Sequence, residues 1–183
     1  WTPVSYEDSS RSTQEQHLDI DHVTFGHDIE TAFLLLESAH ALEFPEDSVL
    51  THAKRMVDHT IEHAWDPVEG GFYDRGYYFQ GDDHLTVTDS SKIWWAQAEA
   101  LHSLLIMAQY FPDDPNHDYF DLFARQWRYI TTNLLDPKHG GWYNAGIDED
   151  PDARLAPKAT IWKGNYHTIR SLLRSRELLR GME

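Results

Sequence analysis

The stretch DPVEGGFY, residues 66–73, returns in altered form as DPKHGGWY, residues 136–143. FGHDIE at residues 25–30 and WKGNYH at residues 162–167 keep the same period, because the spacing from His27 to His167 is twice that from Asp66 to Asp136. A repeat of about 70 residues can hold one pair of helices, and such units stack side by side. Matching positions in successive units can then face one shared cavity. The period predicts a stack of helix pairs with an acid/base imidazole on each side of one substrate.

Composition restricts the class of protein. The 183 residues, 40% hydrophobic and 13% aromatic, predict one globular domain over residues 1–183. The net charge of −16 argues against nucleic acid and anionic membrane as partners. The absence of cysteine excludes disulfides and thiolate catalysis. No apolar run approaches the ~20 residues of a membrane span, and nothing resembles a signal peptide, so we predict a cytoplasmic protein. Because the chain starts at Trp1, we interpret it as a fragment or a processed piece.

The apolar periodicity predicts an all-α chain with structured loops. We expect five helices, at about residues 26–42, 46–64, 91–110, 116–135 and 162–179. Residues 1–24 are expected to be an irregular N-terminal segment, and residues 72–79 could form a short hairpin. Odd-numbered helices would form one ring and even-numbered helices another. The predicted fold is therefore an α/α toroid, or part of one.

The period of the repeat also places Gln97 midway between His27 and His167. All three residues fall in predicted inner helices. A polar side chain in an apolar helix is costly unless it meets water, a partner or a ligand. We therefore expect all three side chains to line the wet central funnel of the toroid.

Together, FGHDIE, the two DPxxGGxY loops, WWAQAE at residues 94–99 and WKGNYH resemble the N-acylglucosamine 2-epimerase superfamily. The resemblance is closest to its cellobiose 2-epimerase branch and extends over nearly the whole chain. It implies the C-terminal half of an (α/α)6 barrel. Two positions depart from the family pattern, since Ala96 and Asn165 stand where proline is common.

The resemblance implies a role for each motif residue. His27 and His167 would be the general acid/base pair, and Trp95 and Trp162 would stack on sugar rings. Glu30 and Glu99 would bind sugar hydroxyls or orient the imidazoles. The family opens the sugar ring and removes the proton at C2 to give an enediol-type intermediate. Reprotonation at C2 from the other face gives the 2-epimer, whereas reprotonation at C1 gives a ketose. No metal and no cofactor are implied.

The residue types support this chemistry by themselves. A proton next to an aldehyde is weakly acidic, and an imidazole can take and return it. Glu30 lies one helical turn from His27 and can bias its tautomer. Trp94 and Trp95 are adjacent and cannot share one helix face, so we expect one to pack in the core. Trp95 is the expected platform, and Gln97 and the carboxylates are the expected partners of sugar hydroxyls.

Alternatives remain open. HTIEH at residues 59–63 matches a zinc-protease pattern. A glycoside hydrolase would use a carboxylate pair such as Glu30 and Glu99, with Asp28 as a further candidate. The chain could be an N-acylglucosamine 2-epimerase, an aldose–ketose isomerase or an inactive carbohydrate-binding fragment. The expected partners are a carbohydrate and either a second copy or a missing N-terminal half.

Overall fold

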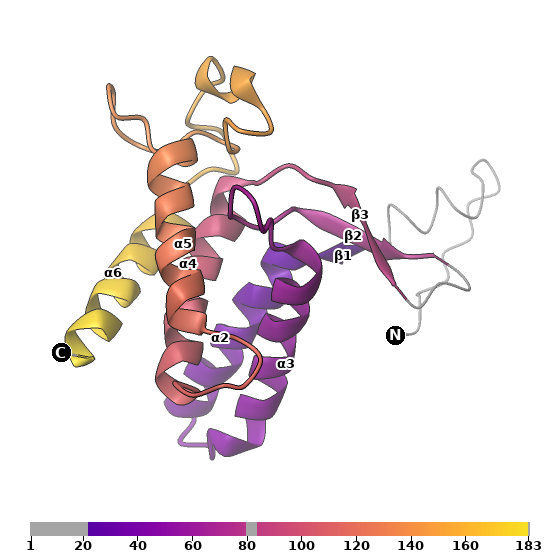
Figure 1. The fold of residues 1–183 in the computed structure, drawn as a ribbon. Coiled ribbons are helices and arrows are strands. Elements are labelled where there is room, and N and C mark those ends of the chain that lie inside the picture. The colour runs from indigo at the N-terminus through magenta and orange to yellow at the C-terminus, as the bar shows by residue number, and fades with distance from the viewer. Residues whose placement is uncertain (1–21, 80–83, 183) are drawn as a thin grey trace.

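The computed structural model describes residues 22–79 and 84–182. Five α-helices and a small sheet make up this part of the chain (Figure 1). The helices are α2 (Phe25–Ala41), α3 (Asp47–Ala64), α4 (Trp94–Tyr110), α5 (Tyr119–Tyr129) and α6 (Tyr166–Gly181), and the strands are β1 (Val23–Thr24), β2 (Arg75–Tyr78) and β3 (Leu85–Asp89). A π-helical turn, Ile130–Leu134, continues α5, and a 3-10 turn spans Pro151–Arg154.

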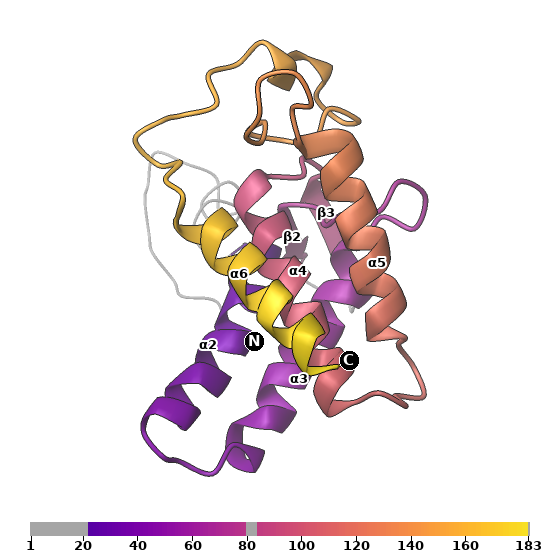
Figure 2. The same cartoon turned by 90° about the vertical axis from the view of Figure 1, so that its left-hand side faces the viewer.

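The helices lie in two layers, as predicted. Helix α4 packs between α2 and α6, and these three helices form the inner layer (Figures 1 and 2). Helix α3 packs on α2 and α5 packs on α4, which makes the outer layer. The odd-numbered helices of the sequence analysis are therefore the inner ones.

Burial explains why α4 is central. Its side chains are buried almost all round, with Leu101, Leu104 and Leu105 at 1% exposure or less. A helix that is apolar on every side must be covered on every side. By contrast, α3 and α5 each bury one stripe, for example Val57 in α3 and Leu122 in α5.

The two glycine loops have the same structure, which confirms the repeat. Short antiparallel bridges close them, Trp65 with Phe72 in the first loop and Leu135 with Trp142 in the second. The glycine pairs have positive φ, +81° and +82° at residues 70 and 71, and +70° and +74° at residues 140 and 141. Residues with a Cβ rarely adopt this conformation. Glycine therefore suits these four turn positions.

A small sheet accompanies the predicted helices. Its order is β1-β2-β3, fully antiparallel, with Val23 opposite Gly76 and Gly76 opposite Val87. Residues 72–79 do not form a hairpin by themselves, since they contain only β2 and the second arm of the hairpin is β3. Residues 23–24 form strand β1 instead of irregular structure. They pair with β2, which lies far away in the sequence, so no local sequence pattern predicts this pairing. Residues 1–21 of the predicted irregular segment lie outside the described residues.

Three predicted helix boundaries were wrong. The third helix begins at Trp94 rather than at residue 91, and α5 begins at Tyr119, where the Asp118 side chain caps its N-terminus. The fifth helix was expected from residue 162 but begins at Tyr166. The segment before it is held in a loop, since Lys163 Nζ donates to the carbonyl oxygens of Trp142 and Tyr143, at 2.6 and 2.9 Å.

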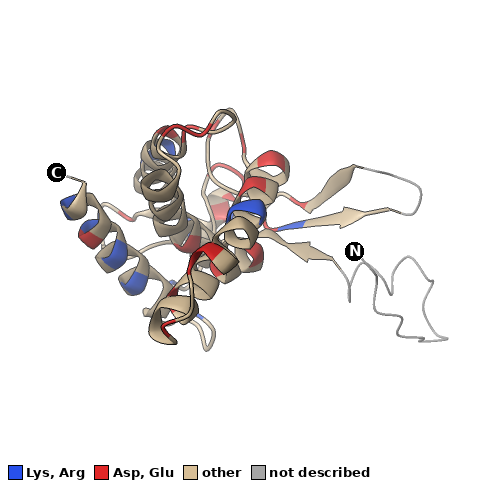
Figure 3. Ribbon diagram, turned by 90° about the horizontal axis from the view of Figure 1, so that it is seen from below, with Lys and Arg blue, Asp and Glu red and all other residues tan. Residues whose placement is uncertain are grey.

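Charge is unevenly distributed between the helices. Basic residues recur along α6 (Figure 3), whereas α2 carries only acidic charges, Asp28, Glu30 and Glu37. Helix α6 carries four arginines and one glutamate in a chain of net charge −16. Among the described residues, no helix combines the length and apolarity that crossing a bilayer would demand.

Candidate active site

The predicted site residues gather at the N-terminal ends of the three inner helices. His27 and Glu30 lie in the first turns of α2, Trp95 begins α4, and His167 begins α6. Together they border a cavity of about 300 Å³, lined by His27, Glu30, Ile93, Trp94, Trp95, Trp162 and His167. Residues from both ends of the chain thus form one pocket.

Trp95 packs against both histidines. Its ring centroid is 4.9 Å from that of His27 and 5.5 Å from that of His167. Gly26 makes this position possible, because a Cβ there would lie 2.6 Å from the far edge of the indole. The sequence analysis overlooked Gly26, although it stands directly before His27 in FGHDIE. Trp94 is 6% exposed, so one tryptophan packs in the core as expected.

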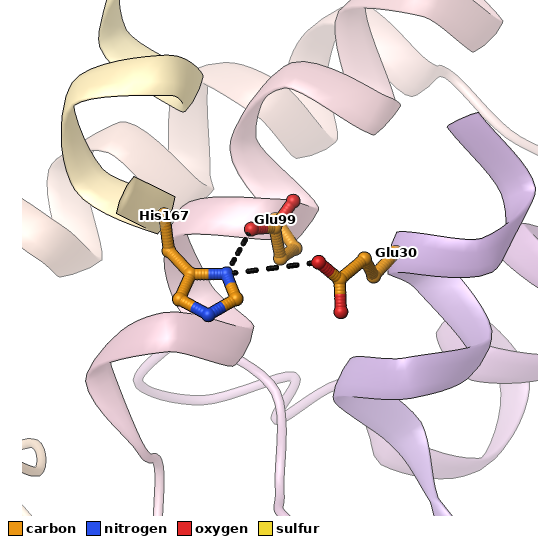
Figure 4. A group of neighbouring side chains, drawn as sticks. All are labelled: Glu30, Glu99 and His167. Carbon is orange, nitrogen blue, oxygen red and sulfur yellow. Dashed lines mark hydrogen bonds and ion pairs between the residues drawn. The ribbon is translucent and has the colours of Figure 1, made fainter. Parts of the chain in front are cut away.

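Two carboxylates hold the imidazole of His167. Its Nδ1 is hydrogen-bonded to Glu99 Oε1 and lies 3.8 Å from Glu30 Oε1. Figure 4 shows the three side chains converging, with Nε2 of His167 turned away from both carboxylates. A neutral His167 bound in this way keeps its proton on Nδ1, because a carboxylate only accepts. Its Nε2 lone pair is then available as a base.

Arg170 joins the two carboxylates and was missed in the sequence analysis. Its Nη2 lies 2.5 Å from Glu99 Oε1 and 3.1 Å from Glu30 Oε1. The guanidinium carbon is 4.6 Å from the ring centroid of Phe33 and 4.0 Å from that of Tyr166. The available signal was its position one turn after the histidine of WKGNYH. This cation offsets part of the charge of the carboxylate pair.

A metal could reach the same atoms only in competition with Arg170. Ligand atoms of Glu30, Glu99 and His167 lie within 4.8 Å of one another, as do those of Asp66, Asp148 and Glu149. The second group also contains a cation, since Lys92 Nζ lies 2.7 Å from Asp66 Oδ2 and 2.6 Å from Asp148 Oδ2. In each group a side-chain cation occupies the place that an ion would take.

His27 has a different environment from His167. Its side chain is exposed and its ring rests against Trp95. The neighbouring carboxylate of Asp28 is directed to the outer layer, where its Oδ2 lies 3.6 Å from His59 Nδ1. The pocket therefore offers one imidazole fixed by carboxylates and one that is open to solvent.

Gln97 does not line the cavity, contrary to the expectation. It is fully buried, accepts a hydrogen bond from Phe72 N at 2.9 Å and donates one to Phe72 O at 2.7 Å. Gln126 from α5 donates to its side-chain oxygen at 3.1 Å. The inner helices do not begin at equally spaced positions and so depart from the strict repeat. Their first residues are Phe25, Trp94 and Tyr166. Because each residue turns a helix by about 100°, such offsets direct Gln97 to the outer layer.

Trp162 lies on the rim of the cavity and is 86% exposed. Its segment is anchored by the adjacent Lys163, whose amino group also lies over the ring of Trp94. Burial, together with the nearby charge of Lys158, lowers the pKa of Lys163 to about 8. An exposed indole on a rim is available to stack on a ligand.

The HTIEH motif lies on α3, in the outer layer. His59 Nε2 is hydrogen-bonded to the hydroxyl of Tyr78 at 2.8 Å, and Glu62 is exposed. Burial and the charge of His59 lower the pKa of His63. Within the described part of the chain, these side chains do not belong to either group that could hold an ion. The motif serves to join α3 to the sheet.

Two layers of paired helices, with acid/base side chains at one end of the inner layer, define an enzyme-like α/α toroid. Residues 6–171 match the N-acylglucosamine 2-epimerase (GlcNAc 2-epimerase) family, and the chain belongs to that family. This confirms both the resemblance and the predicted fold class.

Known proteins of the family are similar over most of this chain. A D-mannose isomerase from Marinomonas mediterranea is 30% identical over 144 residues, which are 79% of this chain and 34% of that protein. A cellobiose 2-epimerase from Dictyoglomus turgidum is 28% identical over 84% of this chain and 37% of its own length. The crystal structure of a D-mannose isomerase superposes with a TM-score of 0.73 at 26% identity, over 91% of this chain and 41% of that one. The chain spans little more than a third of the length of these relatives.

Proposed function

We propose that this chain forms part of the catalytic funnel of a sugar 2-epimerase that acts on the reducing-end glucose of a disaccharide such as cellobiose. After ring opening, one imidazole removes the proton at C2 and leaves an enediol intermediate. The other imidazole returns a proton to C2 from the opposite face. His27 and His167 are the proposed pair, and Trp95 and Trp162 the proposed sugar platforms.

One observation carries the proposal. Two imidazoles border one cavity, and their ring centroids lie 4.9 and 5.5 Å from that of Trp95. Epimerisation requires proton transfer on both faces of one carbon, which two separately placed bases can provide. The bond from Glu99 favours a free lone pair on His167 Nε2, which suits the role of base.

Deuterium incorporation tests the proposed chemistry. The catalytically active assembly of this chain is incubated with cellobiose in heavy water, and label at C2 is measured by mass spectrometry. We expect His27→Ala and His167→Ala each to reduce exchange about 100-fold or more. His52→Ala is the control, since His52 is exposed on α3, outside the cavity. Exchange within a few-fold of the unaltered protein in either cavity variant rules the assignment out.

An aldose–ketose isomerase is the second candidate. The similarity to two D-mannose isomerases, one by sequence and one by structure, favours it. The same enediol gives a ketose when the proton returns to C1. Labelled ketose from mannose or glucose, with little 2-epimer, would select this outcome. N-acylglucosamine 2-epimerase activity is a further option of the same chemistry.

A glycoside hydrolase fits the site less well. A hydrolase needs two carboxylates that flank the scissile bond, but Glu99 is fully buried and engaged by His167 and Arg170. Products without hydrolysis would separate the classes. An inactive carbohydrate-binding fragment would bind sugar without any exchange at C2.

We also propose that the funnel is completed by a second copy or by further helices of a longer chain. The chain covers only 34% to 41% of the relatives reported above. Helix α6 lies at an edge of the inner layer. Three of its apolar side chains are about half exposed, namely Tyr166, Ile169 and Leu173. Such a face favours association with another helix.

A further inference from the structure

Glu99 has one oxygen without a partner. Its Oε1 binds both His167 and Arg170, whereas Oε2 is buried and lacks a hydrogen bond within the described part of the chain. A buried carboxylate oxygen left unpaired costs free energy. The groups that lie near Oε2 therefore matter for how the carboxylate is held.

His102 is an ionisable side chain facing this oxygen. It lies one turn further along α4 and is fully buried, with Nε2 3.9 Å from Glu99 Oε2. Its ring meets Phe33 of α2 edge-on, with centroids 4.3 Å apart. Neither ring nitrogen has a hydrogen bond in residues 22–79 or 84–182. A movement of about 1 Å by either side chain would form a hydrogen bond between them.

The surroundings keep this imidazole neutral. Burial, assisted by the charges of Arg170 and Arg174 on α6, lowers the pKa of His102 to about 3. A neutral imidazole has one N–H to donate. The carbonyl oxygen of Ala98 is the competing acceptor and is shared with the hydroxyl of Ser171. A carboxylate is the stronger acceptor, so we expect the proton on Nε2.

We propose that His102 is a positioning residue, which donates from Nε2 to Glu99 Oε2 and so keeps Oε1 directed at His167. The chain of contacts runs from His102 through Glu99 to the Nδ1 of His167. Partners that orient an acid/base group fix its tautomer in this way. The catalytic consequence rests on the proposed function, whereas the positioning itself does not.

The first test needs no substrate. In the ¹⁵N-labelled chain, the NMR chemical shifts of the imidazole nitrogens report the tautomers of His102 and His167. The spectra are recorded at about pH 8.5, well above the usual pKa of an imidazole. We expect the proton on Nε2 in His102 and on Nδ1 in His167. A His102 protonated on Nδ1 in the unaltered protein overturns the proposal.

A matched pair of variants distinguishes the effect of the hydrogen-bond donor from the effect of side-chain shape. Gln and Met are similar in length, but only Gln can donate a hydrogen bond. We expect His102→Gln to keep the single tautomer of His167 and His102→Met to give a mixture of both. His40→Met is the control, because His40 lines the same cavity of about 530 Å³ as His102 without contacting Glu99. A single tautomer in His102→Met, or its loss in both variants, overturns the proposal.

Activity provides the second readout. In the active assembly we expect His102→Met to lower kcat about tenfold with KM within about twofold, and His102→Gln to restore most of it. If no variant or unaltered protein shows exchange at C2 while the tautomers behave as expected, the proposed function fails and the positioning role stands. Unchanged kcat in His102→Met contradicts a catalytic consequence.

Discussion

At the scale of single residues, the two cavity histidines differ in what surrounds them. His167 is held by a carboxylate pair that also binds Arg170, whereas His27 is exposed beside Trp95. Only the first has a preset tautomer. The proposed reaction needs one base on each face of C2, and the orientation of the substrate on the tryptophans decides which histidine removes the proton.

Trp162 is expected to act on binding rather than on the chemical step. Its indole is 86% exposed on the rim of the cavity. Stacking acts on the ground state and the transition state alike, so its loss raises KM more than it lowers kcat. We expect Trp162→Ala to raise KM about tenfold, with kcat within about threefold, in steady-state assays of the active assembly. A fall in kcat by orders of magnitude at constant KM would contradict this role.

Gln97 is expected to contribute stability instead of substrate contacts. Its amide satisfies both backbone groups of Phe72, which is 1% exposed. Truncation leaves these groups buried without partners, at about 1–3 kcal/mol. We expect Gln97→Ala to lower the free energy of unfolding in urea by about 2–3 kcal/mol, and exposed Gln109→Ala on the same helix to change it by less than about 0.5 kcal/mol. Normal stability with lost sugar binding would restore the original funnel hypothesis.

At the scale of elements, the glycine loops are anchored by lysines in both repeats. The amino group of Lys92 forms ion pairs with Asp66 and Asp148. Its Nζ also lies 5.6 Å from the ring centroid of Tyr73. In the second repeat, Lys158 binds Asp136 and lies 5.5 Å from the ring centroid of Tyr143. The aspartates and tyrosines of the two loops occupy matching positions of the repeat. The lysines do not, and they differ in burial, since the Lys92 side chain is 0% exposed and that of Lys158 29%.

This difference predicts unequal losses of stability. Lys92→Met leaves two carboxylates together without their cation in the interior, which costs about 3–5 kcal/mol. Lys158→Met is the matched control from the other repeat, and its loss should be smaller because the Lys158 side chain is 29% exposed and holds the single carboxylate of Asp136. Both are measured by urea unfolding of the chain. Equal effects would mean that burial does not distinguish the two anchors.

At the scale of the whole molecule, the open edge at α6 is the main consequence of the partial ring. Stacked helical units leave their lateral faces uncovered at each end. The edge combines exposed apolar side chains with the arginines of the helix (Figure 3). An acidic chain offers many carboxylates to such an edge, so a second copy is a suitable partner.

Association should therefore depend on α6. We expect light scattering after size-exclusion chromatography to show a dimer or larger species, because apolar surface is buried on association. Leu173→Lys should shift the chain towards monomer, and Val68→Lys on the exposed first glycine loop should not. A strictly monomeric chain with full epimerase activity would show that neither a second copy nor further helices are needed.

The amino-acid sequence was sufficient to predict the repeat, the helix pairs, the two layers and the motifs that meet in the cavity. These features depend on local patterns: apolar spacing, glycine pairs with positive φ, and motifs at matching positions. Helix geometry also predicted that only one of Trp94 and Trp95 packs in the core, since adjacent residues point to different faces.

Which side chains touch depends instead on how the helices pack in three dimensions. The pairing of β1 with β2 joins Val23 to Gly76, and the clamp of Arg170 joins α6 to Glu30 on α2. Gln97 shows the physical reason. A shift of one or two residues in where a helix begins rotates every side chain by about 100° or more, and packing against neighbouring helices, rather than the repeat itself, sets that rotation.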